Sequence, residues 1–516
     1  MNHTKTLKQL NAEIYSHAKK EDKPHHPYPS PLYTLPMPSS SLPSPNYIHI
    51  TPFSSSFLPL LLSQSLTSLI ILPKFKKNNY LCTFNHFYLM RKASIVFCAL
   101  TLSVGAFAQQ AKDDFKKDRL MSAGNYWAYP GPQKAQTPAP KGYKPFYISH
   151  YGRHGSRYLI GTKDYDTTYF TLAKADSLGK LTPLGKATMG KLKLIREEAM
   201  LRDGELTQRG AEQHKGIARR MYQNFPEVFA GRTTIDAKST TVIRCILSME
   251  NALQQLLLLN PQLIVKHDAS MHDMYYMNQT DDSLRARKMR GAAKDAYLAF
   301  AKKHEMHDRV MNSLFNDAEY WKNNINANEF NRMLIKVANN VQSTELRHKL
   351  QLLDLFTVDE LYENWLVGNA RWYIMYGPSP LNGGTQPYSQ RNLLRNIITQ
   401  ADSCIKLASP GATLRYGHDT MVMPLVCLLN LNQNGRQIAD LEQLAPQNWL
   451  DYKIFPMASN LQFVFYRKNA ADKDVLFKVM LNENEATLPL KAVSGPYYRW
   501  SDFRDFYLKK IDAYKE

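Results

Sequence analysis

The chain has 516 residues, of which 44% are hydrophobic and 21% are charged. These fractions are ordinary for a globular protein with a sizeable core, and the length allows two or three domains. Five cysteines are too few for a disulfide framework, whereas the formal net charge of +20 favours an anionic partner such as nucleic acid, acidic lipid or a phosphorylated small molecule.

The first 89 residues differ in composition from the rest of the chain. Eleven of the 28 prolines fall before residue 74, among the serine tracts 39–41 and 54–56. No amphipathic period is visible, so we expect this segment to be disordered. The apolar stretch at residues 58–73 is interrupted by serine and threonine and makes a poor membrane span.

A complete secretory signal peptide follows at residues 90–108. Two basic residues come directly after Met90, an apolar run follows them, and a small-x-small cleavage site ends at Ala108. Because signal peptides act at amino termini, we interpret residues 1–89 as an upstream extension that is not native to the protein. The alternative is a true amino-terminal domain followed by a membrane helix. We expect export, to the periplasm or beyond, after cleavage near Ala108.

Cleavage there would remove 10 of the 65 Lys and Arg residues and 3 of the 45 Asp and Glu residues, which leaves a mature net charge of +13. Export argues against nucleic acid as the partner, so a phosphorylated small molecule is favoured. The pairing of Cys245, Cys404 and Cys427 stays open. We expect no stable membrane span in the mature chain, and the oligomeric state stays open.

The main chemical motif lies at residues 144–158. A short apolar run at 146–148 predicts a buried strand, and a turn that contains two glycines follows it. In this turn His154 lies between Arg153 and Arg157. Guanidinium groups are planar bidentate donors for phosphate oxygens, and a histidine between them can attack phosphorus. The alternative is a basic surface turn that contains a histidine by chance.

Two later segments add weaker candidates. The segment from Leu206 to Gly210 predicts a helix start capped by Thr207, which is more typical of helix packing than of chemistry. After a β-branched strand, Ser239 or Thr240 can cap another helix. Arg244 then lies in its first turn, where free N–H groups favour an anion. An arginine near a helix start is also common on protein surfaces.

The segment at residues 413–425 carries the last candidates. A short strand ends at Gly417 and a helix begins at Asp419, with Pro424 near the first turn. This pattern puts His418 and Asp419 at a strand-to-helix junction. An alkoxide is a poor leaving group unless a positioned acid protonates it, and a carboxyl group can do so.

These segments resemble the histidine acid phosphatases, branch 2 of the histidine phosphatase superfamily, over about residues 145–516. The family signature Arg-His-Gly-x-Arg-x-Pro is matched except that Leu159 replaces the proline. The resemblance implies a phosphomonoesterase that needs no metal or other cofactor. It implies His154 as the nucleophile, Asp419 as the acid, and as phosphate ligands Arg153, Arg157, Arg244 and His418.

Within the family, Arg-His-Gly-Ser-Arg-Tyr is similar to the Arg-His-Gly-Thr-Arg-Tyr of multiple inositol polyphosphate phosphatases. That branch usually carries His-Ala-Glu where this chain has His418, Asp419 and Thr420, a form typical of other histidine acid phosphatases. We expect inositol polyphosphates such as phytate, because the basic chain suits several phosphates. The alternatives are a broad-specificity phosphatase acting on sugar or other small monophosphates, a non-catalytic polyanion-binding protein, and a mutase-type phosphotransferase.

The expected fold is α/β: a Rossmann-like open sheet with flanking helices, similar to phosphoglycerate mutase, plus an inserted all-α cap. Residues 109–259 and 404–516 are predicted to form the two parts of the core. Residues 260–403 show helical periodicity with Lys/Arg-rich faces and are predicted to form the cap. Because no clustered further ligands support a metal site, we interpret the histidines of this region as lying on solvated helix faces: His267, His272, His304 and His307.

Overall fold

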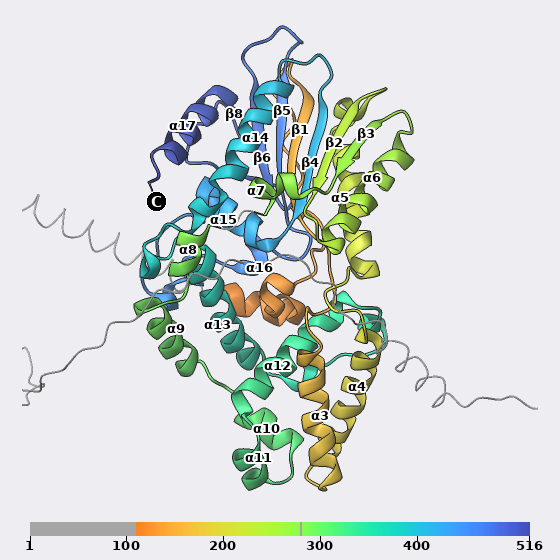
Figure 1. Ribbon diagram of the computed structural model, residues 1–516, viewed down its shortest axis with the longest axis vertical. Coiled ribbons are helices and arrows are strands. Elements are labelled where there is room, and N and C mark those ends of the chain that lie inside the picture. Colours follow the sequence, from red (N-terminus) through yellow and green to blue (C-terminus); the bar gives the residue numbers. More distant parts are fainter. Residues whose placement is uncertain (1–109, 279–280, 516) are drawn as a thin grey trace, which may run out of the picture. The chain divides into compact units, whose positions relative to one another are not determined.

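The computed structural model of the chain describes residues 110–278 and 281–515 (Figure 1). The predictions for residues 1–89 and 90–108 fall outside this part and stay predictions. In the described residues no helix is long and apolar enough to cross a membrane. Cys245, Cys404 and Cys427 are free thiols.

One mixed sheet organises the fold, in the strand order β3-β2-β4-β1-β5-β6-β7, with β8 paired to β6. The parallel strands are β3 (Ile264–Asp268), β2 (Thr234–Ser239), β4 (Gly411–Gly417) and β1 (Lys144–Arg153). The antiparallel strands are β5 (Asn460–Arg467), β6 (Leu476–Leu481), β7 (Asn484–Ala486) and β8 (Tyr498–Arg499). Because β2, β4 and β1 are parallel neighbours, their carboxyl ends meet at one edge.

Helices cover both faces of the parallel strands. Residues of α5 (Gln208–Asn224) and α6 (Ile243–Leu259) pack in one cluster with Ile148 of β1, and α14 (Arg391–Cys404) and α15 (Asp419–Leu429) pack on the opposite face with Tyr147. Strands buried on both faces need nearly continuous apolar side chains, and β4 is buried at every position. The predicted α/β class is therefore confirmed.

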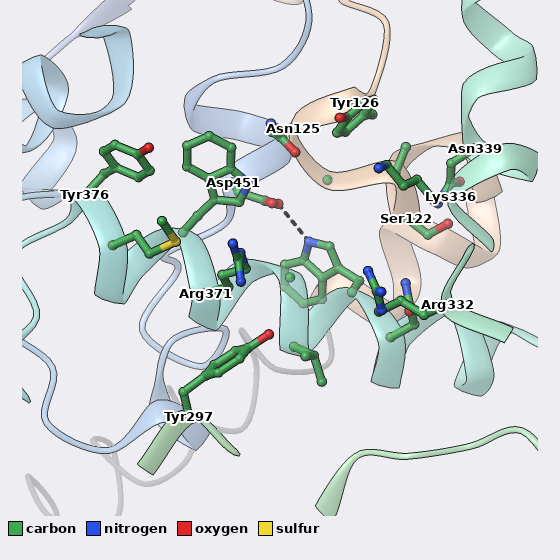
Figure 2. Close-up of a pocket in the computed structure, with 18 residues that line it drawn as sticks. Ser122, Asn125, Tyr126, Tyr297, Arg332, Lys336, Asn339, Arg371, Tyr376 and Asp451 are labelled. Atoms are coloured by element: carbon green, nitrogen blue, oxygen red, sulfur yellow. Dashed lines mark hydrogen bonds between the residues drawn. The ribbon is translucent and has the colours of Figure 1, made fainter. Parts of the chain in front are cut away.

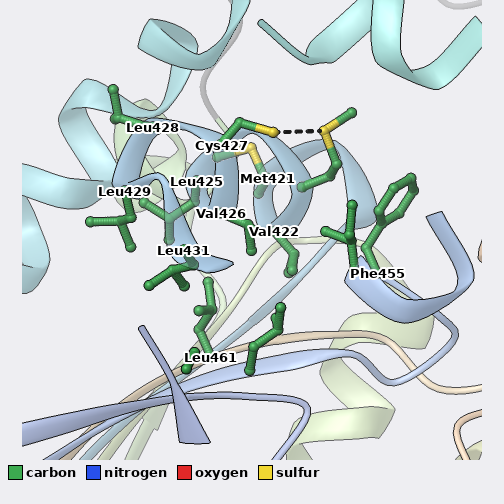
Figure 3. Packing of buried hydrophobic residues seen from close by; sticks show 14 of the residues in the cluster. Met421, Val422, Leu425, Val426, Cys427, Leu428, Leu429, Leu431, Phe455 and Leu461 are labelled. Atoms are coloured by element: carbon green, nitrogen blue, oxygen red, sulfur yellow. Dashed lines mark hydrogen bonds between the residues drawn. The ribbon is translucent and has the colours of Figure 1, made fainter. Parts of the chain in front are cut away.

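Helix α15 is fixed by its apolar side chains. Every residue from Met421 to Leu429 is buried, and Figure 3 shows this helix packed near Phe455 and Leu461. Pro424 lies inside the helix and not near its first turn as expected. This packing holds the first residue of the helix, Asp419, at the carboxyl edge of the sheet.

A second layer of helices lies outside the sheet. It contains α3 (Lys163–Ser177), α4 (Pro183–Ala199), α9 (Ala292–Lys303), α10 (Asp308–Leu314), α11 (Ala318–Asn324), α12 (Ala327–Asn340) and α13 (Val358–Tyr376). Residues of α3, α4, α10 and α12 share one hydrophobic cluster. Four further α-helices are α7 (Met274–Met277), α8 (Asp282–Arg287), α16 (Asp451–Ile454) and α17 (Trp500–Asp512).

The domain limits stay a prediction, but two features of the structure differ from them. Strand β3 lies within the expected cap range 260–403 and yet pairs with β2 in the sheet. Four of its five residues are exposed and only Ile264 and Val265 are aliphatic, so the sequence shows no clear strand pattern there. Helices α3 and α4 come from the expected first part of the core, but they pack with the cap helices because their apolar faces complete the cap cluster.

Two local predictions were wrong. Neither Ser239 nor Thr240 caps α6, because Ser239 is still paired in β2 and the Thr240 N–H donates to the Tyr416 carbonyl (3.0 Å). The helix begins at Ile243 without a side-chain cap. His304 is not on a solvated face: it is buried, and its ring nitrogens contact Glu363 and Glu442.

Candidate active site

The sheet brings the predicted site residues to one edge. Arg153, the last residue of β1, is paired with Gly417 of β4, and the His154 N–H donates to the Gly417 carbonyl at 2.9 Å. His418 follows β4 directly, so its ring lies 5.8 Å from that of His154, measured between centroids. The start of α6, with Arg244, follows β2 on the other side of β4. All six predicted site residues therefore come from adjoining strand ends.

Two glycines let the loop after β1 pack against the start of α5. A Cβ atom on Gly155 would lie 2.4 Å from the Gly210 carbonyl oxygen, and one on Gly210 would lie 2.2 Å from the Ser156 carbonyl oxygen. No larger residue fits at either position. Thr207 caps α5 as predicted and also donates its hydroxyl to the Ser156 carbonyl (3.0 Å). This segment supports the loop by packing, as its sequence indicates.

His154 is held as a neutral, oriented imidazole. The side chain is buried, and Nδ1 lies 2.9 Å from the Gly155 carbonyl oxygen. Since a carbonyl only accepts, Nδ1 carries the hydrogen, which leaves the lone pair on Nε2. Burial, and then the charges of Arg153 and Arg157, hold the pKa of His154 well below its usual 6.5. The ring is therefore an uncharged potential nucleophile at neutral pH.

Arg153 is fully buried and held on three sides. Its Nη1 donates to the carbonyl oxygens of Asn125 (2.5 Å) and Phe455 (2.9 Å). Its Nη2 lies 2.7 Å from Oδ2 of Asp419, which makes a buried ion pair. Burial lowers the pKa of Arg153, while Asp419 raises it. The guanidinium plane is thus fixed directly beside the proposed nucleophile and acid.

Arg157 and Arg244 complete the basic part of the site. Arg157 donates to the carbonyl of Tyr158 (2.8 Å) and to the Tyr126 hydroxyl (3.2 Å), and it lies 5.2 Å from the centre of the Tyr126 ring. Burial lowers the pKa of Arg244. Cys245 partly offsets this effect, and repulsion by Arg157 adds to it. The Nε atoms of both arginines have no hydrogen-bond partner among the described residues. They remain available to donate to an oxyanion.

His418 is also uncharged. Its Nε2 lies 3.3 Å from the Thr240 hydroxyl and 3.7 Å from the Cys245 sulfur. Burial lowers its pKa to about 4, although Asp419 acts in the opposite direction. A neutral imidazole carries one N–H, which can donate to a phosphate oxygen.

Asp419 is the only acidic side chain among the predicted site residues. Its Oδ2 accepts from Nδ2 of Asn125 (3.3 Å) beside the Arg153 contact, and its Oδ1 accepts from the Thr420 backbone N–H (2.9 Å). Burial raises its pKa, but Arg153, Arg157 and His418 together outweigh burial and hold that pKa below the usual 3.8. The carboxyl group is therefore ionised when the site is without a ligand.

A cavity of about 610 Å³ adjoins this cluster (Figure 2). It lies between the 3₁₀ segment η1 (Arg119–Tyr126) and helices α12 and α13. Asn125 and Tyr126 line the cavity and also contact Asp419 and Arg157 of the site. These two residues therefore form a wall that the site and the cavity share.

Three basic residues line the cavity. Arg332 and Lys336 are one turn apart on α12, and Arg371 comes from α13. Lys336 is paired with Asp164 at 2.6 Å, whereas Arg332 and Arg371 are exposed and have no ion pair in the described part of the chain. The sequence predicted Lys/Arg-rich helix faces in this region but not these positions. An anion with several charges would find two unpaired guanidinium groups here.

The family model for the histidine phosphatase superfamily (branch 2) matches residues 152–482, which is more than half of the chain. The chain belongs to this family. A multiple inositol polyphosphate phosphatase 1 from Dictyostelium discoideum is 26% identical over 110 residues. That match spans 20% of this chain and 17% of the relative.

Solved structures agree on the fold. The chain is similar to the multiple inositol polyphosphate phosphatase of Bifidobacterium longum in complex with phosphate, with a TM-score of 0.62 and 17% identity over 76% of this chain and 98% of that chain. It is also similar to the phytase from D. castellii, with a TM-score of 0.55 and 15% identity over 76% and 85% of the two chains. The resemblance to histidine acid phosphatases is confirmed, and with it the expectation of a phosphatase-type enzyme.

For this member of the family, sequence motifs identified the six residues that the structure brings together, but they missed Asn125 and Tyr126. Both lie in η1, ahead of the first matched motif, and their contacts to Asp419 and Arg157 span large separations in sequence. No local pattern marks such residues. Among the described residues, no group of three or more His, Cys, Asp or Glu side chains is placed to hold a metal ion.

Proposed function

We propose that the chain hydrolyses phosphate monoesters through a phosphohistidine intermediate, with inositol polyphosphates as its substrates. The observation that carries the proposal is the buried, neutral His154, which lies among Arg153, Arg157 and Arg244 and whose Nε2 has no hydrogen-bond partner among the described residues. Fixed cations beside a developing phosphoryl charge are the main source of catalysis in phosphoryl transfer.

The reaction is proposed to take two steps. In the first, the His154 Nε2 lone pair forms a bond to phosphorus, the ester P–O bond breaks, and Asp419 protonates the departing oxygen. In the second, water attacks phosphorus, the N–P bond breaks, and inorganic phosphate leaves. The arginines and His418 hold the equatorial oxygens in both steps.

Asp419 must gain a proton before it can give one, because it is ionised in the unliganded site. A phosphate monoester loses its second proton near pH 6, so a substrate monoanion can bring the required proton with it. Bound phosphate also competes for Arg153, which weakens the ion pair that keeps Asp419 ionised. Acidic conditions should therefore favour turnover.

The cavity supports a substrate with several phosphates. The cavity adjoins the site at Asn125 and Tyr126, so we propose that the other phosphates of a substrate extend past these two residues toward Arg332 and Arg371 while one phosphate reacts at His154. The names of the similar proteins, multiple inositol polyphosphate phosphatase and phytase, agree with this choice. The +13 charge of the processed chain would further attract a polyanion.

The second candidate is a broad-specificity phosphatase that acts on sugar or other small monophosphates. The sequence of His418, Asp419 and Thr420 favours it, because the inositol polyphosphate branch usually carries His-Ala-Glu there. A non-catalytic polyanion-binding protein is disfavoured, since such a protein would have no need of the acid beside His154. Export through the signal peptide at residues 90–108 remains part of the proposal.

A phosphate-release panel on residues 109–516 tests this proposal. Phytate, a sugar monophosphate and phosphotyrosine are compared at low and high salt. We expect phytate to have the lowest KM, and this KM to rise fastest with salt, because its binding depends on more charges. Equal KM values with equal salt responses would favour the broad-specificity candidate, and no phosphate release from any substrate would reject catalysis.

A further inference from the structure

A buried carboxylate, Asp451, joins the core to the cap beside the site, and no step of the proposed reaction uses it. Asp451 begins α16 and is 2% exposed. Its Oδ1 accepts the indole N–H of Trp365 at 2.7 Å, and its backbone N–H donates to Asn369 at 3.0 Å. Both partners belong to α13 of the cap. Figure 2 shows Asp451 at the cavity, where a dashed line marks the hydrogen bond that its carboxylate accepts.

The same carboxylate fixes the course of η1. Gly124 has φ 58° and ψ −128°, a backbone conformation that residues other than glycine rarely adopt. A Cβ atom at Gly124 would lie 2.6 Å from Oδ2 of Asp451, so the main chain passes directly against the carboxylate. The backbone N–H of Asn125 adds a hydrogen bond that favours the ionised form of Asp451. The Asp451 carboxylate therefore holds the backbone of η1 in position at Asn125.

Asn125 in turn contacts the acid and its arginine. Its carbonyl accepts from Nη1 of Arg153 at 2.5 Å, and its Nδ2 donates to Oδ2 of Asp419 at 3.3 Å. Arg153 pairs with the same oxygen. A side-chain amide can donate to an ionised carboxylate and, after rotation, accept from a protonated one. Such a partner suits a carboxyl group that loses and regains a proton in each turnover.

We propose that Asn125 is a positioning residue for Asp419, and that Asp451 acts through Asn125 by holding the backbone of η1. The proposal rests on the proposed function, because it requires Asp419 to be the acid. It also couples the cap to the chemistry, since α13 holds Asp451 through Trp365 and Asn369.

The cost of burying Asp451 supports a role at the site. The carboxyl group has no ion pair in the part of the chain that the structure describes, and burial raises its pKa to about 6. A buried carboxylate without an ion pair destabilises a fold, and perturbed groups of this kind gather at functional sites. An apolar side chain in its place would leave the indole N–H of Trp365 and the backbone N–H of Asn125 without this acceptor.

The test measures kcat/KM for two substrates that differ in leaving group, p-nitrophenyl phosphate and glycerol phosphate. An acid matters most for the poor alkoxide leaving group. For Asn125→Ala we expect a loss of about tenfold with glycerol phosphate and of less than about threefold with p-nitrophenyl phosphate. A merely structural role would lower both values equally. Asn324→Ala, an exposed asparagine on α11, serves as the control and should change neither.

Asp451→Asn tests the second half of the proposal. It should give the same selective loss as Asn125→Ala, and the double variant should lose no more than Asn125→Ala alone, because Asp451 acts through Asn125. Additive losses would overturn this link. If Asp451→Asn does not fold, Gly124→Ala replaces it, since the new Cβ would press on the carboxylate.

Asp419→Asn, measured in parallel, distinguishes a failure of the positioning role of Asn125 from a failure of the proposed function. If it loses glycerol phosphate activity selectively while Asn125→Ala does not, the positioning role is overturned and the proposed function stands. If Asp419→Asn loses both activities equally, Asp419 is not the acid, and the positioning role falls with it. Activity that depends on His154 would survive either result.

Discussion

The core site and the cap cavity differ in the burial and pairing of their arginine side chains. In the core, Arg153 is fully buried, is held by two carbonyls and is paired with Asp419. In the cavity, Arg332 and Arg371 are exposed and make no ion pair within the described residues. Buried charges in a low dielectric act strongly and in one geometry, whereas exposed charges act weakly and are screened by salt.

This difference separates the chemistry from the choice of substrate. A rigid buried cluster suits one phosphoryl group in one orientation. Exposed guanidinium groups without an ion pair among the described residues suit the remaining phosphates of a polyanion, whose positions vary. Changes in the core should therefore lower the rate for every substrate, and changes in the cavity should lower affinity only for substrates with several charges.

The largest expected effect follows from removing the nucleophile. His154→Ala should lower phosphate release from phytate and from p-nitrophenyl phosphate alike by roughly four orders of magnitude, because no other side chain takes over the attack. The measurement is kcat/KM for both substrates, with circular dichroism to verify folding. His267→Ala, an exposed histidine on β3, is the matched control and should keep full activity.

The next effect concerns the acid. Asp419→Asn should lower kcat/KM by about a hundredfold to a thousandfold for an alkyl phosphate, and by much less for p-nitrophenyl phosphate, whose leaving group needs little protonation.

For the unchanged enzyme, kcat/KM should fall as pH rises above about 6, because the substrate monoanion that brings the proton disappears. A flat profile from pH 5 to pH 8 would count against this source of the proton.

Asp451 lies at the boundary between the two regions. Because burial raises its pKa, we expect it to make the stability of the fold depend on pH. Burial raises its pKa from 3.8 to about 6, so the folded state binds this proton more tightly than the unfolded chain. Its contribution to stability therefore falls as pH rises through this window and stays low above it. Relative to the wild type, Asp451→Asn should gain up to about 3 kcal/mol between pH 4 and pH 7.

Urea unfolding at several pH values measures this difference. The comparison uses the change in free energy of unfolding with pH in each protein, so that a constant packing cost of the substitution cancels. A wild-type curve parallel to that of Asp451→Asn across this range would show that Asp451 is ionised in both folded and unfolded states.

The smallest expected effect is in the cavity. Arg332→Ala and Arg371→Ala should each raise KM for phytate by about threefold to tenfold at low salt, and the effect should shrink as salt is added. KM for p-nitrophenyl phosphate should stay unchanged. Arg395→Ala, which removes an exposed arginine of α14, controls for the change in net charge. An equal rise in KM with Arg395→Ala would mean that the cavity has no special role.

The parts of the core site that sequence could predict are those that follow a local pattern. His154, between two arginines after an apolar strand, and Asp419, at the start of an apolar helix, are both marked by their neighbours in the chain. The strand-to-helix junctions at both motifs fit the α/β class that the family resemblance implied, and the register of β1 with β4 brings both motifs to one edge.

What sequence could not predict depends on contacts between distant segments. Asn125 acquires its role only where η1 meets Asp419, 294 positions later in the chain. Strand β3 is a mostly exposed edge strand with only two aliphatic residues, so neither a period of two nor an apolar run predicted it. The buried environment of His304 likewise comes from Glu363 and Glu442, which lie on other elements.

Trapping the intermediate is the most direct test of whether His154 carries the phosphoryl group. The enzyme is mixed with p-nitrophenyl phosphate, quenched within milliseconds in base, digested and analysed by mass spectrometry. We expect one phosphorylated peptide, modified at His154, whose label is stable in base and lost in acid, and no label in His154→Ala. A phosphoryl group found on another residue, or full turnover by His154→Ala, would contradict it.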